Sequence, residues 1–304
     1  SVMETQHDIL VQNKRSVQFR FTINRKFTVI RGDSATGKTT LFQMVSDANM
    51  SRGTGVAVSC DAPVIALYET GYQYELSNEK GRIYIIDEDF AKLKTKEFAS
   101  LVLRSDNCFI FITRESLPAI PYSYKEIYKI KTSGKFHTLE RIYPDFDELI
   151  EKDVMVTEDE DAGLTYYQYY FGDKVVTSHG NSNLSKFGSC ESLLIGDGSA
   201  IGAYIQDLAI TKSELYLPES FEWKLLNNGM FANDETIREL IEHPERMVDT
   251  SQVSTERYCA NLLADRTANT PAQYSKSKLN ECYIKPCCCK GTKCEFFTRD
   301  KKQK

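Results

Sequence analysis

The chain has 304 residues and a net charge of −5, with 41% hydrophobic and 27% charged residues. These proportions exclude a disordered chain, and the length predicts two globular domains. The sequence contains no run of 18 apolar residues, which excludes a membrane-spanning helix. The first 25 residues carry charges throughout and lack the apolar core of a secretion signal, so we expect a cytoplasmic protein with no membrane partner.

The first half of the chain alternates short apolar runs with amphipathic segments. We predict helices from Lys38 onward and over 92–104. The predicted strands cover 17–21, 27–30, 56–58, 64–67, 83–86, 109–112, 125–131 and 136–142. The last two can form a hairpin around Ser133 and Gly134. Strands that alternate with helices form parallel sheets covered on both faces, so we expect a parallel-sheet α/β domain over residues 1–144.

A second alternation follows Pro144 and an acidic stretch, where we place the domain boundary. The predicted strands cover 154–156, 174–177, 193–195 and 214–217, and the predicted helices cover 161–171 and 200–209. This pattern indicates a smaller α/β domain over residues 150–220. Residues 221–304 form a region that is helical to about residue 267 and then ends in a basic, cysteine-rich tail.

The segment from Gly32 to Thr39 matches the P-loop pattern G-x-x-x-x-G-K-[ST] between an apolar strand and a helix. The glycines let backbone N–H groups surround phosphate oxygens, and the helix N-terminus adds partial positive charge. We expect Lys38 to reach the β- and γ-phosphates of ATP and Thr39 to ligate Mg²⁺. The predicted nucleotide-binding residues are Gly32, Asp33, Ser34, Ala35, Thr36, Gly37, Lys38, Thr39 and Thr40.

Asp87 and Glu88 directly follow the apolar run 83–86 and resemble the Walker B motif of P-loop ATPases. The resemblance implies that Asp87 holds Mg²⁺ and that Glu88 is a catalytic residue that orients the attacking water. Thr113 and Arg114 end the next predicted strand, where several ATPase families place a polar residue that senses the γ-phosphate. An exposed arginine after a strand is also common, so this second interpretation stays open.

Glu158 and Asp197 each end a predicted strand of the second domain. Groups at the carboxyl ends of parallel strands converge on one crevice, and two acids placed there can share Mg²⁺. The segments 156–162 and 197–202 resemble the two acidic motifs of Toprim domains. An ATPase domain followed by a Toprim-like domain is similar to the overcoming-lysogenization-defect (OLD) family, in which an ATPase regulates a metal-dependent nuclease. That resemblance implies catalytic roles for Glu158 and Asp197, DNA or RNA as substrate, and conceivably a role in phage defence.

The second domain departs from the Toprim pattern at two positions. Ser199 stands where the second aspartate is expected, and no glycine follows Glu158. Glu219 could supply a replacement metal ligand, and Asp159 and Glu160 could also contribute. The departures leave open a different class of function, a nucleotide-controlled switch that binds a protein partner or a second copy of the chain. A P-loop kinase is a weaker alternative, because no basic lid segment is evident between residues 87 and 144.

The tail contains five of the nine cysteines, which are Cys282, Cys287, Cys288, Cys289 and Cys294. Cysteines two to four residues apart are typical of zinc sites, but three adjacent cysteines cannot all face one metal ion. We therefore favour free or oxidised thiols over a zinc site formed by Cys282, Cys287 or Cys289, and Cys294, to which Cys259 could add a ligand. The basic residues around them could contact a nucleic-acid backbone. His179, in a polar loop, is interpreted as a turn residue rather than a general base.

Overall fold

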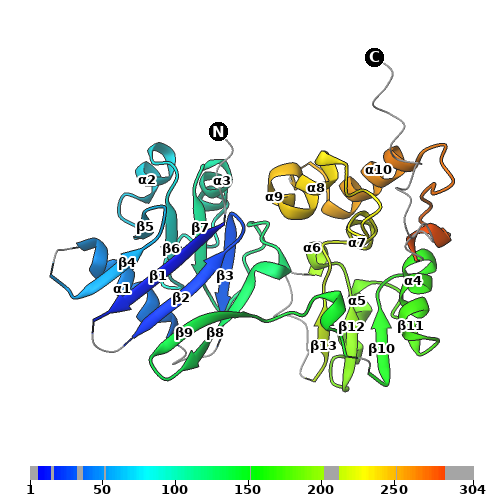
Figure 1. Cartoon of the computed structure of the whole chain (residues 1–304), viewed down its shortest axis with the longest axis horizontal. Coiled ribbons are helices and arrows are strands. Elements are labelled where there is room, and N and C mark those ends of the chain that lie inside the picture. Colours follow the sequence, from blue (N-terminus) through cyan, green and yellow to red (C-terminus); the bar gives the residue numbers. More distant parts are fainter. Residues whose placement is uncertain are drawn as a thin grey trace, which may run out of the picture. The chain divides into compact units, whose positions relative to one another are not determined.

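The computed structural model describes residues 6–14, 17–32, 37–50, 53–150, 152–201, 212–250 and 252–284 (Figure 1). Residues 33–36 of the predicted P-loop and the tail cysteines after residue 284 lie outside the described residues. The chain divides into two compact units, Ser1–Ile142 and Tyr143–Lys304. In the described ranges, no helix combines the length and apolar character needed to cross a membrane.

The first unit is built on one large sheet, whose described strands run in the order β4-β1-β2-β9-β8-β3-β7-β6-β5. Its strands are β1 (His7–Asn13), β2 (Gln18–Ile23), β3 (Phe27–Arg31), β4 (Val56–Ser59), β5 (Val64–Ala66), β6 (Ile83–Ile86), β7 (Cys108–Ile112), β8 (Ile127–Ser133) and β9 (Phe136–Arg141). In the run β8-β3-β7-β6-β5, each strand is parallel to the next.

The expected parallel sheet accounts for only this part, and the other side of the sheet is mixed, with the expected hairpin around residues 133–134 present. β1 pairs antiparallel with both β2 and β4, and β8 pairs antiparallel with β9. The connections from β1 to β2 and from β8 to β9 are too short for a crossover helix, so these pairs form antiparallel hairpins. β1 and the helix α2 (Tyr72–Asn78) have no counterpart among the predicted elements.

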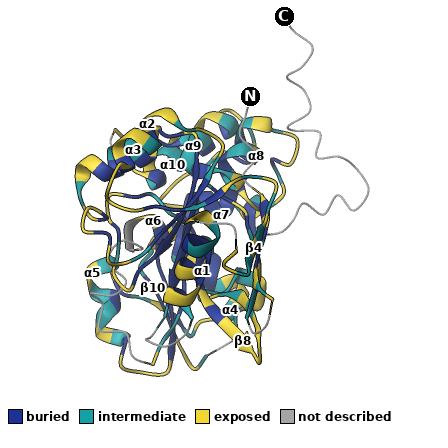
Figure 2. Ribbon diagram, turned by 90° about the vertical axis from the view of Figure 1, so that its left-hand side faces the viewer, coloured by how far each residue is buried: buried dark blue, intermediate teal, exposed yellow. Residues whose placement is uncertain are grey.

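Helices cover both faces of the parallel strands. α1 (Lys38–Met50) buries Leu41 in the same core as Ile83 and Ile85 of β6. Side chains alternate along a strand, and Tyr84 accordingly faces away from α1 and donates a 2.9 Å hydrogen bond to Glu75 of α2. α3 (Lys96–Arg104) starts later than predicted, and residues 92–95 form the turn that precedes it. Figure 2 shows the resulting separation of buried strands from exposed helix surfaces.

The second unit contains a smaller sheet, parallel throughout, with its described strands in the order β11-β10-β12-β13. The strands are β10 (Val154–Thr157), β11 (Val175–Thr177), β12 (Ser192–Ile195) and β13 (Glu214–Tyr216). The helices are α4 (Asp161–Phe171), α5 (Asn181–Leu184), α6 (Gly198–Ile201), α7 (Phe221–Leu226), α8 (Glu235–Glu242), α9 (Pro244–Met247) and α10 (Thr255–Thr267). Residues 202–209 of the helix predicted over 200–209 lie outside the described residues.

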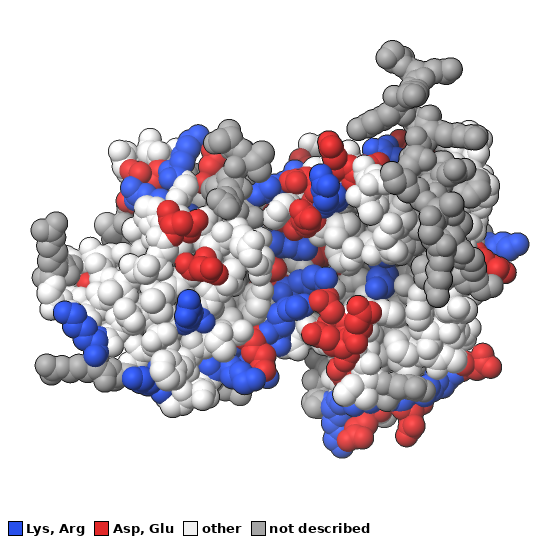
Figure 3. Space-filling model, viewed as in Figure 1, with Lys and Arg blue, Asp and Glu red and all other residues white. Residues whose placement is uncertain are grey.

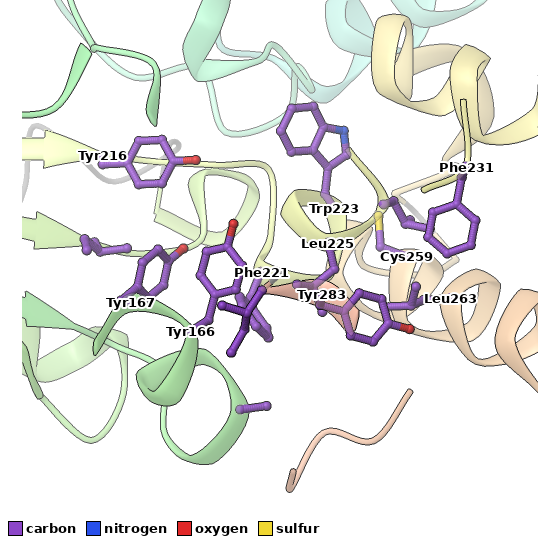
Figure 4. Packing of buried hydrophobic residues seen from close by; sticks show 14 of the residues in the cluster. Tyr166, Tyr167, Tyr216, Phe221, Trp223, Leu225, Phe231, Cys259, Leu263 and Tyr283 are labelled. Carbon is purple, nitrogen blue, oxygen red and sulfur yellow. The ribbon is translucent and has the colours of Figure 1, made fainter. Parts of the chain in front are cut away.

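One hydrophobic core joins this sheet to the helices that follow it. Tyr167 of α4, Trp223 of α7 and Cys259 of α10 are buried in the same cluster as Leu193 of β12 (Figure 4). The described helices after residue 220 therefore belong to the same compact unit as the smaller sheet.

Candidate functional site

A pocket of about 500 Å³ lies in the first unit where α1 starts and β6 and β7 end. Parallel strands bring their carboxyl ends to one edge of the sheet, and ligands of open α/β sheets bind at that edge. The lining residues are Val17, Gly37, Lys38, Thr39, Thr40, Asp87, Glu88, Ile112, Arg114, Thr132 and His137. The structure thus brings residues 37–40 of the predicted nucleotide-binding segment and the two predicted acids together around one space.

Lys38 is the first residue of α1 and is only 5% exposed. Its ammonium group donates a hydrogen bond to the carbonyl oxygen of Gly32. Gly37 has a φ of 93°, in the left-handed region that favours glycine, and its carbonyl accepts the N–H of Leu41 at 2.9 Å. Thr39 is exposed in the first turn of the helix. The strand-to-helix turn therefore presents an ammonium group and a hydroxyl group beside the pocket.

Asp87 is partly buried directly after β6, and burial raises the pKa of its carboxyl group above the ordinary value. The N–H of Glu88 donates to its Oδ1 at 2.9 Å and, with the nearby Lys38 ammonium, opposes that rise. When it is ionised, this carboxylate offers the kind of oxygen ligand that binds a hard divalent ion such as Mg²⁺.

Arg114 forms an ion pair with Glu88, with 3.2 Å between Nη2 and Oε1. The pair exists because β7 lies between β3 and β6 in the sheet, which places the end of β7 beside the end of β6. The other predicted sensor residue, Thr113, is buried, and its hydroxyl group exchanges hydrogen bonds with the backbone of Glu115.

The antiparallel part of the sheet contributes pocket residues that the sequence analysis missed. His137 of β9 stacks on Phe19 of β2, with ring centroids 4.5 Å apart and an interplanar angle of 20°. Burial lowers the pKa of the His137 imidazole. The stacking of His137 on Phe19 depends on the pairing of β2 with β9. These strands are far apart in the sequence, and no sequence motif predicts that they pair.

In the second unit, Glu158 and Asp197 come to the same edge of the smaller sheet because β10 and β12 are paired in parallel. The carboxylate of Glu158 accepts the backbone N–H of Asp197. The carboxylate of Asp197 in turn accepts the N–H of Phe221, at the start of α7, at 3.0 Å. Both acids are therefore held in place by backbone groups.

Burial strongly raises the carboxyl pKa values of a group of acids at this edge. It raises the pKa of Glu158 to about 8 and that of Asp159 to about 7, and it raises the pKa of Asp197 well above its usual value. The nearby carboxylates of Glu222 and Glu256 increase all three pKa values further. Clusters of strongly shifted pKa values occur preferentially at functional sites.

Glu222 of α7 and Glu256 of α10 were missed because they lie in the region that the sequence pattern assigns to packing helices. Glu222 is only 2% exposed and accepts a hydrogen bond of 2.6 Å from the hydroxyl group of Tyr274. Glu256 forms an ion pair of 2.6 Å with Lys276. Neither residue belongs to a recognisable motif.

Ser199 and Glu219 also meet at this edge, through the backbone. Both the N–H and the hydroxyl group of Ser199 donate to the carbonyl oxygen of Glu219. Among the described residues, Glu158, Asp197 and Glu219 do not form a group whose ligand atoms all lie within 4.8 Å of one another. The structure therefore gathers these acids at one sheet edge without closing them into a three-ligand set.

His179 follows β11 at the same sheet edge as Glu158, and the N–H of the next residue, Gly180, donates to the carbonyl oxygen of Glu158 at 3.1 Å. His179 is exposed in a turn with a φ of 56°, and its Nδ1 lies 2.7 Å from Glu160 Oε1. Cys259 is buried in the core, and Cys282 is half-buried. Figure 3 shows basic and acidic side chains interspersed on the face of each unit that it presents.

Comparison with known proteins gives no match: neither the models of protein families nor the curated proteins include one that matches this chain.

Proposed function

We propose that the first unit binds and hydrolyses ATP with Mg²⁺, as a P-loop ATPase domain. The observation that carries this proposal is the shared pocket of Lys38, Thr39, Asp87 and Glu88 at the carboxyl edge of the parallel strands. Lys38 would pair with the β- and γ-phosphates, Thr39 and Asp87 would hold Mg²⁺, and Glu88 would orient the attacking water. The chemistry needs positioning and charge stabilisation, which these groups supply.

Lys38→Ala is expected to abolish ATP turnover, because it removes the cation that balances the phosphate charge. The measurement is steady-state phosphate release with Mg²⁺·ATP. Lys96→Ala, which removes an exposed lysine at the start of α3, is the matched control and should keep wild-type turnover. Full ATPase activity in Lys38→Ala would overturn the assignment.

We further propose that the second unit is a Toprim-like domain that the ATPase regulates, in the arrangement of the OLD family. Support comes from Glu158 and Asp197, which follow adjacent parallel strands and have strongly raised pKa values. Two carboxylates in such a position can bind Mg²⁺ and stabilise the charge that develops when a phosphodiester is cleaved. DNA or RNA is the corresponding substrate class.

The second candidate function is a nucleotide-controlled switch in which the second unit binds a partner and cleaves nothing. It is favoured by Ser199, which lacks a carboxylate and whose hydroxyl group is bonded to the backbone of Glu219.

Nicking of plasmid DNA and cleavage of RNA with Mg²⁺ or Mn²⁺ separate the two functions. The nuclease proposal expects cleavage that Glu158→Ala and Asp197→Ala each remove, with Glu191→Ala, a change at an exposed acid of the same unit, as the control. A wild-type protein that cleaves neither substrate with either metal supports the switch.

A further inference from the structure

His7, Cys60 and Asp61 meet at the edge of the first unit's sheet. β1 begins at His7 and β4 ends at Ser59, and the antiparallel register pairs Leu10 with Ser59. In this register, the residues that follow β4 lie beside the start of β1. The three side chains therefore come from two neighbouring strand ends.

The three groups are close enough to bind one ion. Nδ1 of His7 lies 2.8 Å from Oδ1 of Asp61, and Sγ of Cys60 lies 3.2 Å from the same oxygen. One ligand atom from each residue lies within 4.8 Å of the other two, and this is the one group of three such residues in the described ranges. Cys60 and Asp61 can face the same side because the chain leaves the strand at Ser59 and bends at Asp61.

These separations fit a tetrahedral metal site after a small expansion. Zinc bonds of about 2.0–2.1 Å to nitrogen and oxygen and about 2.3 Å to sulfur imply ligand–ligand distances of roughly 3.3–3.6 Å in a tetrahedron. The observed distances are shorter by about half an ångström, because hydrogen bonds now join the atoms. Movement of the Asp61 carboxylate alone, whose side chain is 55% exposed, would open the required space.

The donor set selects the class of metal. An imidazole, a thiolate and a carboxylate together suit Zn²⁺ and similar transition-metal ions, whereas Mg²⁺ prefers oxygen ligands throughout. The imidazole of His7 is only 6% exposed, so it is held in place before an ion arrives. The exposed side of Asp61 leaves a fourth position for water.

We propose that His7, Cys60 and Asp61 form a binding site for a transition-metal ion of the Zn²⁺ type. The ion would join the start of β1 to the turn after β4, which is the outermost strand of the sheet. The site is separate from the nucleotide pocket, whose lining includes none of these residues. The proposal does not depend on ATP hydrolysis.

Titration of the full chain with Co²⁺ tests the site, because a thiolate ligand gives a sulfur-to-cobalt absorption band. Four of the five tail cysteines are replaced in all proteins by Cys287→Ser, Cys288→Ser, Cys289→Ser and Cys294→Ser, so that only the remaining thiols can contribute. We expect one equivalent of Co²⁺ to produce the band and one equivalent of Zn²⁺ to displace it. Zn²⁺ should also raise the melting temperature.

Two variants and one control complete the test. Cys60→Ser should lose the band, and Asp61→Asn should bind Co²⁺ at least tenfold more weakly, because an amide oxygen is a poorer ligand. Cys190→Ser, at an exposed cysteine of the second unit, should behave as the background protein does. Asp61 is exposed, so Asp61→Asn should fold even if Cys60→Ser does not. The absence of the band in the background protein, its survival in Cys60→Ser, or unchanged affinity in Asp61→Asn would overturn the proposal.

Discussion

Glu158, Asp159 and Asp197 lie at the sheet edge of the second unit, where Asp197 is buried and the other two are partly buried, and each has a raised carboxyl pKa. A raised pKa in the folded state means that the folded protein binds protons more tightly than the unfolded chain does. As the pH rises from the ordinary carboxyl pKa of 4.5 towards about 8, ionisation of Glu158 therefore destabilises the fold. Such acids cost stability unless a cation joins them.

Glu158→Gln should accordingly stabilise the second unit at pH 8 in metal-free buffer and have little effect at pH 5. The amide keeps the acceptor for the N–H of Asp197 and removes the buried charge. We expect a gain of more than about 1 kcal/mol in the free energy of unfolding, since one pKa unit corresponds to about 1.4 kcal/mol. Thermal unfolding at the two pH values measures it. Glu191→Gln, at an exposed acid, is the control and should leave the free energy of unfolding unchanged at both pH values. An equal effect of Glu158→Gln at pH 5 and pH 8 would contradict the prediction.

At the residue scale, the acids that end strands could be found from the sequence, and the others could not. Glu158 and Asp197 each lie two residues after an apolar run, so their place at a sheet edge follows from the local pattern. Glu222 and Glu256 reach the same edge only because α7 and α10 pack there. Packing between helices that are distant in sequence has no local signature. Glu222 and Glu256 could therefore be placed at this edge only from the structure.

At the element scale, the order of strands decides which residues meet. β7 follows β6 in the chain but inserts between β3 and β6, which brings Arg114 to Glu88. Each of these strands is predicted from the sequence, because buried parallel strands have continuous apolar runs. The hairpin of β8 and β9 is also predicted, from the turn at residues 133–134. β1 and its antiparallel pairing with β2 and β4 are not predicted, since pairing partners depend on the connections and on long-range contacts rather than on composition.

Arg114→Ala tests the role of this strand order in the proposed ATPase. Arg114 can orient Glu88 in the free protein and can meet the developing phosphate charge during hydrolysis. We expect kcat to fall on the order of 100-fold with a smaller change in KM, because the interaction strengthens in the transition state. Arg104→Ala, at the exposed end of α3, is the control. A change in KM alone would show that Arg114 contributes only to ground-state binding.

At the scale of the whole molecule, the chain has two units with separate hydrophobic cores. The single tryptophan, Trp223, is 1% exposed in the core of the second unit. Its fluorescence therefore reports on the second unit alone, whereas circular dichroism reports on both. This difference allows the effect of a nucleotide on each unit to be measured in the intact chain.

Mg²⁺·ATP is expected to raise the melting temperature of the first unit, because a ligand at 100 times its Kd stabilises the folded state by about 2.7 kcal/mol. If the ATPase controls the second unit as proposed, the nucleotide must also interact differently with two states of that unit, and the melting midpoint from Trp223 fluorescence should shift as well. Lys38→Ala should abolish both shifts, and Lys96→Ala should keep both. A melting temperature that rises by circular dichroism while the Trp223 midpoint stays constant would mean that ATP binds without affecting the second unit. That result would exclude regulation of the acidic site by the nucleotide.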